Sequence, residues 1–183
     1  MEDTPWINHD GEQFLKDIGV KPGDTVVDFG CGEGDYSIPA AQIVGSTGIV
    51  YAVDKKENIL DELVSKIDLD NIVTVVTTDA TTGIDGQSAD VILVYDILHY
   101  GGKPQRTRIY TEAYRLLKKM GLMSVHPKHC KTDFPLGGLA DMDIHDIIKE
   151  IENAHFHLQN IVTKKLLHDH TYTTGTILQF TRP

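Results

Sequence analysis

Cysteine is scarce in this chain of 183 residues, which carries only Cys31 and Cys130. Two thiols cannot form a disulfide framework, so we expect a protein of the reducing cytoplasm. Long apolar runs are also missing, and no stretch approaches the length that spans a membrane. The N-terminus lacks the charged and then apolar pattern of a signal peptide. We therefore expect no membrane span.

Basic residues are also fewer than acidic ones. The chain has 17 lysines and arginines against 27 acids, which gives a formal net charge of −10. A surface of this sign repels phosphate backbones, so we expect no nucleic acid partner. A local basic patch would be the exception, and Lys103, Arg106 and Arg108 form a candidate. Three charges in this pattern are more typical of the solvated start of a helix.

The overall composition and length are typical of one globular domain. The apolar share of 40% and the charged share of 24% are ordinary, and 183 residues can build a single sizeable core. We find no internal repeat, low-complexity segment or linker in the sequence. Residues 1–183 are therefore expected to form one domain.

A strand, a glycine-rich turn and a helix follow one another early in the chain. Residues 25–29 are β-branched and aromatic and predict a buried strand, and residues 37–43 predict a helix. Between them lie Gly30, Gly32 and Gly34. This arrangement brings bare backbone and a helix N-terminus to a ligand, and such loops usually hold a nucleotide-like cofactor.

The glycine spacing separates the possible cofactors. A dinucleotide fingerprint needs a third glycine where this chain has Asp35, and a phosphate-binding loop needs a lysine that is absent. The pattern present is acid-x-Gly-x-Gly-x-Gly, beginning at Asp28. It resembles motif I of the class I, Rossmann-like methyltransferases that use S-adenosylmethionine (SAM). A carboxylate suits the ammonium group of SAM. The alternative is an ordinary glycine turn.

Two further acids end successive predicted strands. Residues 49–53 form an apolar run that ends at Asp54, and residues 72–77 lead to Asp79 and Ala80. A carboxylate offers two oxygens to the ribose diol, and the resemblance implies that Asp54 and the adjacent Lys55 bind the cofactor. It also implies that Asp79 accepts from the adenine amino group while Ala80 leaves room for the ring. Ligands of open α/β sheets bind beyond these strand ends.

The fourth predicted strand carries the candidate chemistry. Residues 89–96 and the following 97–102 resemble motif IV of the family, which implies that Tyr95 and Asp96 face the cofactor. Methyl transfer needs a base only if the acceptor arrives protonated. His99 is the candidate, because imidazole titrates near neutral pH, although it could equally cap a helix. Tyr100 is a candidate for contact with the acceptor.

The rest of the chain resembles the family by topology. A helix is predicted after residue 102, and Gly121 leads into a strand at 122–126. Residues 141–154 predict an amphipathic helix, and 156–167 and 172–181 predict two strands that close the sheet. The predicted fold is α/β, with a seven-stranded, mostly parallel, doubly wound sheet, a C-terminal antiparallel hairpin and helices on both faces. Its parts are an N-terminal helix segment (1–22), a cofactor-binding core (24–126) and a substrate-side remainder (127–183).

Nine histidines raise the question of a metal. His126 and His129 follow the fifth strand and border the expected acceptor mouth, so they are candidates for acceptor contact or structural polar groups. His168 and His170 fall on the hairpin loop at the sheet edge, so the histidine groups need not converge. No metal is therefore predicted. Trp6, the single tryptophan, could cover the pocket or pack against the first helix.

The acceptor is predicted to be a small molecule. The Asn-Pro-Pro-Tyr pattern of amine and amide methyltransferases is absent, since the stretch here is Asp96-Ile97-Leu98-His99. The chain resembles the ubiquinone and menaquinone group of C-methyltransferases, or the thiol and metalloid methyltransferases. Two cysteines cannot supply the three thiolates of an arsenite enzyme. The alternatives are a protein or RNA methyltransferase, and a SAM-binding protein without transfer activity. A monomer or homodimer is expected.

Overall fold

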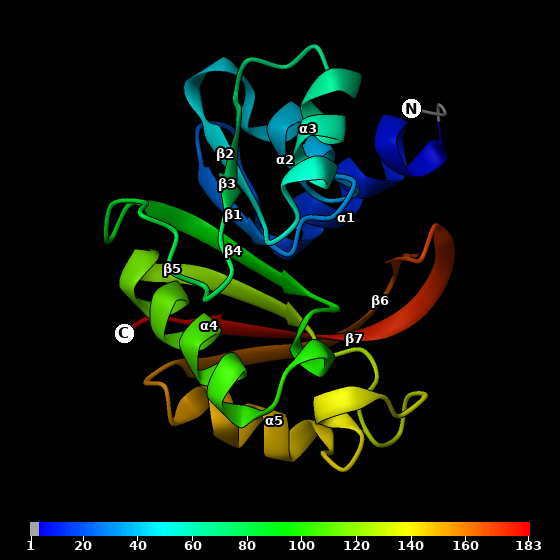
Figure 1. Ribbon diagram of the computed structural model, residues 1–183, viewed down its shortest axis with the longest axis vertical. Coiled ribbons are helices and arrows are strands. Elements are labelled where there is room, and N and C mark those ends of the chain that lie inside the picture. The colour runs from blue at the N-terminus through cyan, green and yellow to red at the C-terminus, as the bar shows by residue number, and fades with distance from the viewer. Residues whose placement is uncertain (1–3) are drawn as a thin grey trace.

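The structure is a computed structural model, and it describes residues 4–183. Its centre is a seven-stranded sheet with the strand order β3-β2-β1-β4-β5-β7-β6 (Figure 1). The first five strands are parallel, and β7 and β6 are antiparallel. The strands are β1 (Thr25–Phe29), β2 (Ile49–Asp54), β3 (Ile72–Val76), β4 (Ala89–Tyr95), β5 (Leu117–His126), β6 (His157–His168) and β7 (Thr171–Thr181). This is the predicted doubly wound fold with its closing hairpin.

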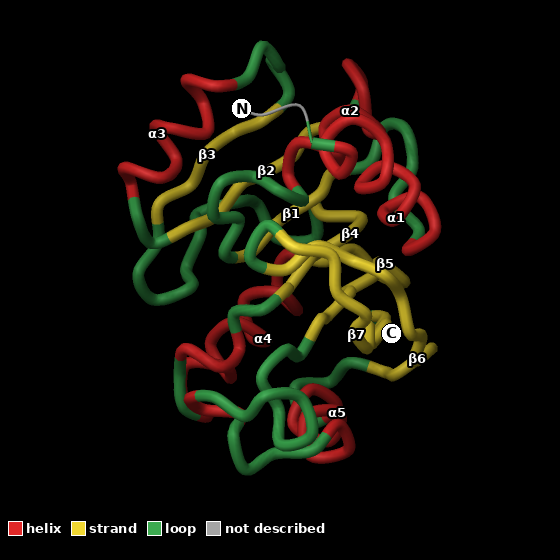
Figure 2. The backbone as a smooth tube through the Cα atoms, turned by 90° about the vertical axis from the view of Figure 1, so that its right-hand side faces the viewer, coloured by secondary structure: helices red, strands yellow, loops and turns green. Residues whose placement is uncertain are grey.

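Helices cover both faces of the sheet (Figures 1 and 2). Successive strand residues point to opposite faces, so Val26 packs in one core and Val27 in the other. One face carries a short π-helical turn (Trp6–Asp10), α1 (Gly11–Ile18), α2 (Ser37–Val44) and α3 (Glu57–Lys66). The other face carries α4 (Lys103–Leu116) and α5 (Ile144–Glu152). Within residues 4–183, no helix is both long enough and apolar enough to cross a membrane.

Local sequence explains where α5 begins. The Asp143 carboxylate accepts from the backbone amides of His145 and Asp146, and the Asp146 carboxylate accepts from the Asp143 amide. This reciprocal capping satisfies amides that a helix start leaves unpaired. Ile147 and Ile151 then face the core. The helix lies within the predicted residues 141–154.

The β6–β7 hairpin reaches beyond the sheet. β7 pairs with β5 only between Leu178 and Thr181, while the hairpin continues toward its tip at Asp169 and His170. Leu166 and Ile177 pack in the same core as α1, so the free end curves over the N-terminal helices (Figure 1). This curvature carries the tip to the carboxyl ends of the parallel strands.

The start of β5 differs from the prediction. The strand begins at Leu117, which pairs with Ala89, and not at residue 122. The register shifts between this pair and the next, Val91 with Leu122. Gly121, predicted to lead into the strand, therefore lies inside an irregular strand. A single glycine within a strand is a common mark of such an irregularity.

Candidate functional site

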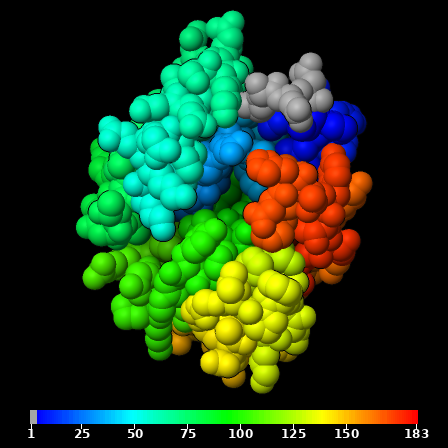
Figure 3. Space-filling view, turned by 45° about the vertical axis from the view of Figure 1, so that its right-hand side comes forward, coloured from blue at the N-terminus to red at the C-terminus, as the bar shows by residue number. Residues whose placement is uncertain are grey.

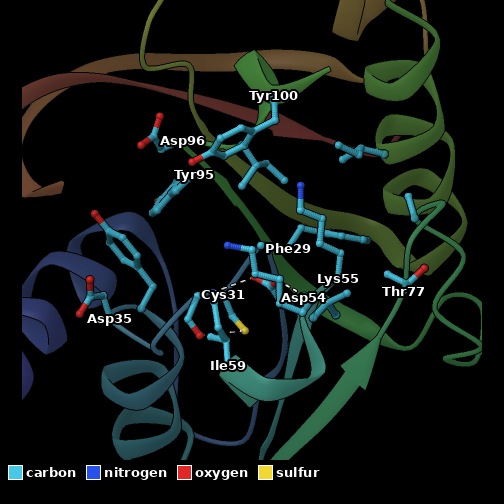
Figure 4. A pocket seen from close by; sticks show the side chains of 18 of the residues that line it. Phe29, Cys31, Asp35, Asp54, Lys55, Ile59, Thr77, Tyr95, Asp96 and Tyr100 are labelled. Carbon is cyan, nitrogen blue, oxygen red and sulfur yellow. Dashed lines mark hydrogen bonds between the residues drawn. The ribbon is translucent and has the colours of Figure 1, made fainter. Parts of the chain in front are cut away.

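A cavity of about 490 Å³ opens at the carboxyl ends of the parallel strands. It lies beside β1 and β4, where the strand order reverses, which is where open α/β sheets bind ligands. Figure 3 shows the hollow between the segment near residue 60, the green segment near residue 100 and the orange tip of the hairpin. Figure 4 shows Tyr95, Asp96 and Tyr100 across the cavity from Cys31, Asp54 and Lys55.

Two of the three motif glycines form the floor of this cavity. Gly30 and Gly32 have φ of 73° and 52°, a left-handed conformation that side chains rarely adopt. A Cβ atom on Gly30 would clash with Ile97, whereas a Cβ atom on Gly32 would meet no atom within 4 Å. Gly32 therefore leaves open space for a ligand. Gly34 lies behind the floor, where a Cβ atom would crowd Leu63 and Ile38.

Asp54 and Asp79 both line the cavity, as predicted. Asp54 accepts from the backbone amides of Gly32 (3.2 Å) and Lys56 (3.0 Å), so the loop after β1 is tied to the end of β2. Asp79 Oδ1 accepts from the Thr81 amide at 3.0 Å, and this bond lowers the pKa of the Asp79 carboxyl. Lys55 and Ala80 also lie on the wall.

Asp28 does not occupy the position expected of it. Its side chain is buried beneath the loop, and its carboxylate accepts from the Ser37 hydroxyl at 2.6 Å. Burial raises the pKa of Asp28 to about 7. Its side chain leaves the strand on the α2 side of the sheet and does not line the cavity. The residue supports the glycine loop from behind.

The opposite wall carries the polar groups that follow β4 and β5. Tyr95 is buried, and its hydroxyl lies 2.7 Å from the Ser124 hydroxyl. Asp96 has φ of 54°, and Tyr100 is 73% exposed, so its ring is free to meet a ligand. The Lys55 ammonium lies 5.4 Å from the centre of the Tyr100 ring, which brings the two walls together. His126 completes this wall.

His99, the predicted base, is turned into the protein. It lies in a 3₁₀ turn (Leu98–Tyr100), is 4% exposed and does not line the cavity. Its Nδ1 lies 3.2 Å from Asp96 Oδ1, and its ring centre lies 3.9 Å from that of Tyr100, with the two rings tilted by 41°. Burial, assisted by His129 and His168, lowers the pKa of His99 to about 4. Asp96 thus lies between His99 and the cavity.

His126 and His129 occupy different places. His126 lines the cavity, and its Nδ1 lies 2.9 Å from the Thr176 carbonyl oxygen. A carbonyl only accepts, so Nδ1 carries the hydrogen, and Nε2 has no hydrogen-bond partner among the described residues. Burial lowers the pKa of His126 to about 4. His129 lies behind the wall, with Nδ1 at 3.0 Å from the Phe134 carbonyl oxygen.

His168 is the residue that sequence reasoning missed. The sequence predicts it on the hairpin loop, but it ends β6, lines the cavity and lies 2.8 Å from Asp96 through its Nδ1. Its ring centre is 5.3 Å from that of His129. The sequence does not require the histidine groups to converge, but His129 and His168 do. The only sequence feature that pointed to this residue was the His-Asp-His run at the hairpin tip. The curvature that brings the tip to the cavity depends on packing elsewhere in the chain, so the run alone does not predict it.

Trp6 packs inside the protein and does not cover the cavity. Its indole is 1% exposed and contacts Phe14 of α1 at a ring separation of 5.5 Å. Its Nε1 donates to the Asp35 carbonyl oxygen at 2.7 Å. This is the packing alternative, with the added effect that the N-terminal turn holds the glycine loop.

The central residue of the candidate basic patch is buried. Arg106 is 3% exposed and forms a two-point ion pair with Glu150, at 2.6 and 2.8 Å. Lys103 and Arg108 remain exposed. The three residues therefore do not form a continuous basic surface.

Comparison with known proteins shows which families and proteins this chain is similar to. A family model described as a methyltransferase domain matches residues 26–121, more than half of the chain. A 50-residue segment is 50% identical to the 2-phytyl-1,4-naphtoquinone methyltransferase of Trichormus variabilis, and it covers 27% of this chain and 22% of that protein. The chain thus matches about a fifth of the length of such curated relatives.

Two solved structures share the fold over nearly the whole chain. A SAM-dependent methyltransferase from Aquifex aeolicus superposes with a TM-score of 0.74 at 21% identity, covering 98% of this chain and 95% of that one. The magnesium protoporphyrin IX methyltransferase of Synechocystis, with bound SAM, gives 0.66 at 21% identity, covering 97% and 78%. At these identities the likeness shows the fold alone. The match of the family model over residues 26–121 shows in addition that the chain belongs to the methyltransferase domain family.

Proposed function

We propose that this chain is a SAM-dependent methyltransferase whose acceptor is a small molecule. The observation that carries the proposal is the cavity, in which the glycine floor and Asp54 face a wall of polar side chains. One side of the cavity suits an adenosine, and the other can hold a second reactant. Residues 1–183 are proposed to act as one domain, in the cytoplasm, as a monomer or homodimer.

The residues of the first wall fit the cofactor. The cavity volume of about 490 Å³ lies in the usual range for ligand sites. Gly32 leaves open space beside Asp54, whose two oxygens each keep a lone pair for the ribose hydroxyls. Asp79 Oδ2 is free to accept from the adenine amino group, with Ala80 and Lys55 beside it. Bound SAM would supply a methyl group on a positively charged sulfur.

The chain's own contribution is alignment and exclusion of water. Tyr100 and the hairpin tip border the cavity opening, and they would limit solvent around the two reactants. The buried Asp28 would act at a distance, by holding the glycine loop through Ser37. Holding two reactants in line supplies much of the rate in such displacements.

The roles that we propose for the residues of the opposite wall, which follows β4 and β5, differ from the prediction that makes His99 the base. Asp96 faces the cavity, and we assign His99 the task of positioning Asp96 from behind. Nε2 of His126 is unprotonated but buried, so we assign His126 a place in the wall behind the acceptor and no direct hydrogen bond to it. Tyr100 would cover the acceptor. His129 and Trp6 act through other residues and would not contact it.

A small acceptor is favoured over a macromolecule. The relatives named above carry the names of a naphthoquinone and a porphyrin methyltransferase, both of which denote small acceptors. The burial of Arg106 also removes the basic patch that an RNA acceptor would use. A SAM-binding protein without transfer activity remains the competing function.

Product analysis tests the proposal. The protein is incubated with methyl-labelled SAM and a panel of quinols, phenols, thiols, protein and RNA, and NAD is included as a non-binding control because the third fingerprint glycine is absent. Label in a small molecule is the expected result. Label in protein or RNA would move the function to a macromolecular acceptor. SAM binding by calorimetry without turnover on any member would favour the binding protein.

A further inference from the structure

Two imidazoles and one carboxylate meet at the edge of the cavity. Asp96 follows β4, His129 follows β5 and His168 ends β6, and one ligand atom from each lies within 4.8 Å of the others. His168 Nδ1 is 2.8 Å from Asp96 Oδ2, and His129 Nε2 is 3.7 Å from Asp96 Oδ1. Three separate parts of the chain therefore bring metal-binding side chains to one point.

The His129 ring presents a nitrogen atom in the form that a metal requires, and the His168 ring would exchange a hydrogen for the ion. His129 Nδ1 lies 3.0 Å from the Phe134 carbonyl oxygen, which can only accept, so the neutral ring keeps a lone pair on Nε2 toward Asp96. His168 Nδ1 lies 2.8 Å from Asp96 Oδ2, and a carboxylate only accepts, so Nδ1 carries the hydrogen here. A bound ion would replace that hydrogen, and Nε2, which lies 3.5 Å from the Asp169 carboxylate, would then carry it. Metal-bound histidines almost always use the second nitrogen in this way, which fixes the ring.

Polar atoms within this cluster lack partners. Asp96 Oδ1 and His99 Nδ1 are both buried without a hydrogen bond among residues 4–183, although they lie only 3.2 Å apart. Buried carboxylate oxygens are normally paired, so an orphaned one needs an explanation such as a bound ion. A cation on Asp96 Oδ1 would satisfy it.

The backbone at two of the three residues is strained. Asp96 has φ of 54° and His129 has φ of 67°, both in the left-handed region that non-glycine residues rarely adopt. Such conformations persist where the surrounding structure enforces them, and they concentrate at functional sites. Both turns serve to aim a side chain at the cluster.

We propose that Asp96, His129 and His168 form a binding site for a divalent first-row transition ion. Two histidines and one carboxylate are a recurrent ligand set for zinc and iron, with coordination positions left open for a reactant. With bonds of about 2.1 Å, tetrahedral ligands lie about 3.4 Å apart, so only a small closing movement is needed. Asp96 and His168 line the cavity, and the open position would face it.

The role of the ion rests on the proposed function. In the open position it would bind an oxygen of the acceptor and polarise it, as metal ions do for hydroxyl and carbonyl groups. The acceptor class would then be an oxygen-bearing molecule, such as a phenol or a hydroxyketone. Metal binding itself needs neither cofactor nor acceptor, and can be measured alone.

The test is a titration of untagged, chelator-treated protein with Co²⁺, followed by displacement with Zn²⁺. We expect one ion per chain, a visible absorption band from the cobalt complex, and a rise in melting temperature with Zn²⁺. His129→Asn, His168→Asn and Asp96→Asn should each weaken binding at least about tenfold. His145→Asn and His157→Asn, at exposed histidines outside the cluster, should bind like wild type.

His168→Asn is the safest of the three, because His168 ends β6 beside the hairpin tip and, unlike Asp96 and His129, does not have a left-handed backbone conformation. Circular dichroism establishes that each variant is folded before it is titrated. The proposal is overturned if the wild type shows no stoichiometric binding, since Asp96 and His168 would then be a simple ion pair. It is equally overturned if the control variants lose as much affinity as the cluster variants. SAM calorimetry on metal-free protein tests the proposed function separately.

Discussion

The hydroxyl of Tyr36 donates to the main-chain carbonyl oxygen of Leu167 over 2.7 Å. Tyr36 directly follows the glycine loop, and Leu167 precedes His168 near the hairpin tip, so one bond joins the two walls of the cavity. Burial raises the pKa of the Tyr36 phenol well above its usual value, and the group therefore remains a donor at all working pH values.

Removal of this hydroxyl should loosen the hairpin without changing the fold. Tyr36→Phe keeps the ring but leaves the Leu167 carbonyl without its donor, so the free energy of unfolding should fall by about 1–3 kcal/mol in urea titrations. Tyr172→Phe is the matched control, because its hydroxyl bonds to Asp10 at the exposed surface, and it should change stability by about 0.5 kcal/mol or less. Equal losses in both variants would contradict the proposed link.

Asp54 should dominate recognition of the cofactor ribose. Asp54→Ala should weaken SAM binding by about 1–3 kcal/mol in calorimetry, because charge-assisted hydrogen bonds to the diol are lost. Asp54→Asn keeps acceptors for Gly32 and Lys56, and separates loss of recognition from loosening of the loop. Asp61→Ala, on the exposed side of α3, should leave affinity unchanged. Wild-type affinity in both Asp54 variants would remove this residue from the site.

The buried pair Arg106–Glu150 should be a major determinant of stability. Arg106 also donates to the carbonyl oxygens of Gly101 and Gly138, so it joins α4, α5 and the loop that carries His99. Glu150→Ala leaves a buried guanidinium without its partner and should cost about 3–5 kcal/mol. Breaking the exposed pair Lys16–Glu12 should cost about 0.5 kcal/mol or less, measured in the same urea titrations. A Glu150 variant as stable as this control would refute the argument.

Most of the sheet could be predicted because its signals are local. The strand of residues 25–29, the acids at the ends of the next strands and the closing hairpin each follow from apolar periodicity and short spacing. The exception is β5, whose first residues pair with Ala89 across an irregular register. The residue at which β5 begins depends on its pairing with β4, and the sequence of the segment itself carries no information about that pairing.

Cavity-lining residues were predictable on the first wall and at Tyr95, Asp96, Tyr100 and His126 of the opposite wall. Gly30, Gly32, Asp54 and Asp79 follow from the order of strands, because parallel strands end at the same edge. His168 reaches the cavity through a hairpin whose curvature depends on packing against the N-terminal helices, at the other end of the chain. The turn that buries His99 likewise depends on the direction that the backbone takes after β4, and residue spacing does not predict this direction.

Asp28 should make stability depend on pH in an unusual direction. Its pKa is about 7 in the folded protein and about 4 when unfolded, so the folded state holds a proton that the unfolded state releases. This contribution is full below pH 4 and is lost as pH rises through 7. Relative to Asp28→Asn, the wild type should therefore lose about 2–4 kcal/mol of stability between pH 4 and 8. A difference in unfolding free energy that stays constant with pH would contradict the assignment.

His99 is the residue whose role changes most between sequence and structure. Its ring is buried behind Asp96, and its pKa of about 4 leaves it uncharged and weakly basic at neutral pH. His99→Phe keeps a ring against Tyr100 and removes both nitrogens. If His99 only positions Asp96, turnover on the acceptor found by product analysis should fall by about tenfold or less, far from the loss expected of a base.

A positioned general base would behave differently, with a fall of about 10²–10⁴ in turnover and little change in SAM affinity. The conservative variant His99→Gln distinguishes the cases further, because its amide can still face Asp96 but cannot act as a base at neutral pH. We expect His99→Gln to restore turnover relative to His99→Phe, since the contact with Asp96 Oδ1 is recovered. If both variants fall by the larger factor in single-turnover assays while SAM affinity holds, His99 returns to the reaction as its base. In that case the acceptor must reach past Asp96 to a nitrogen that is buried in the present structure.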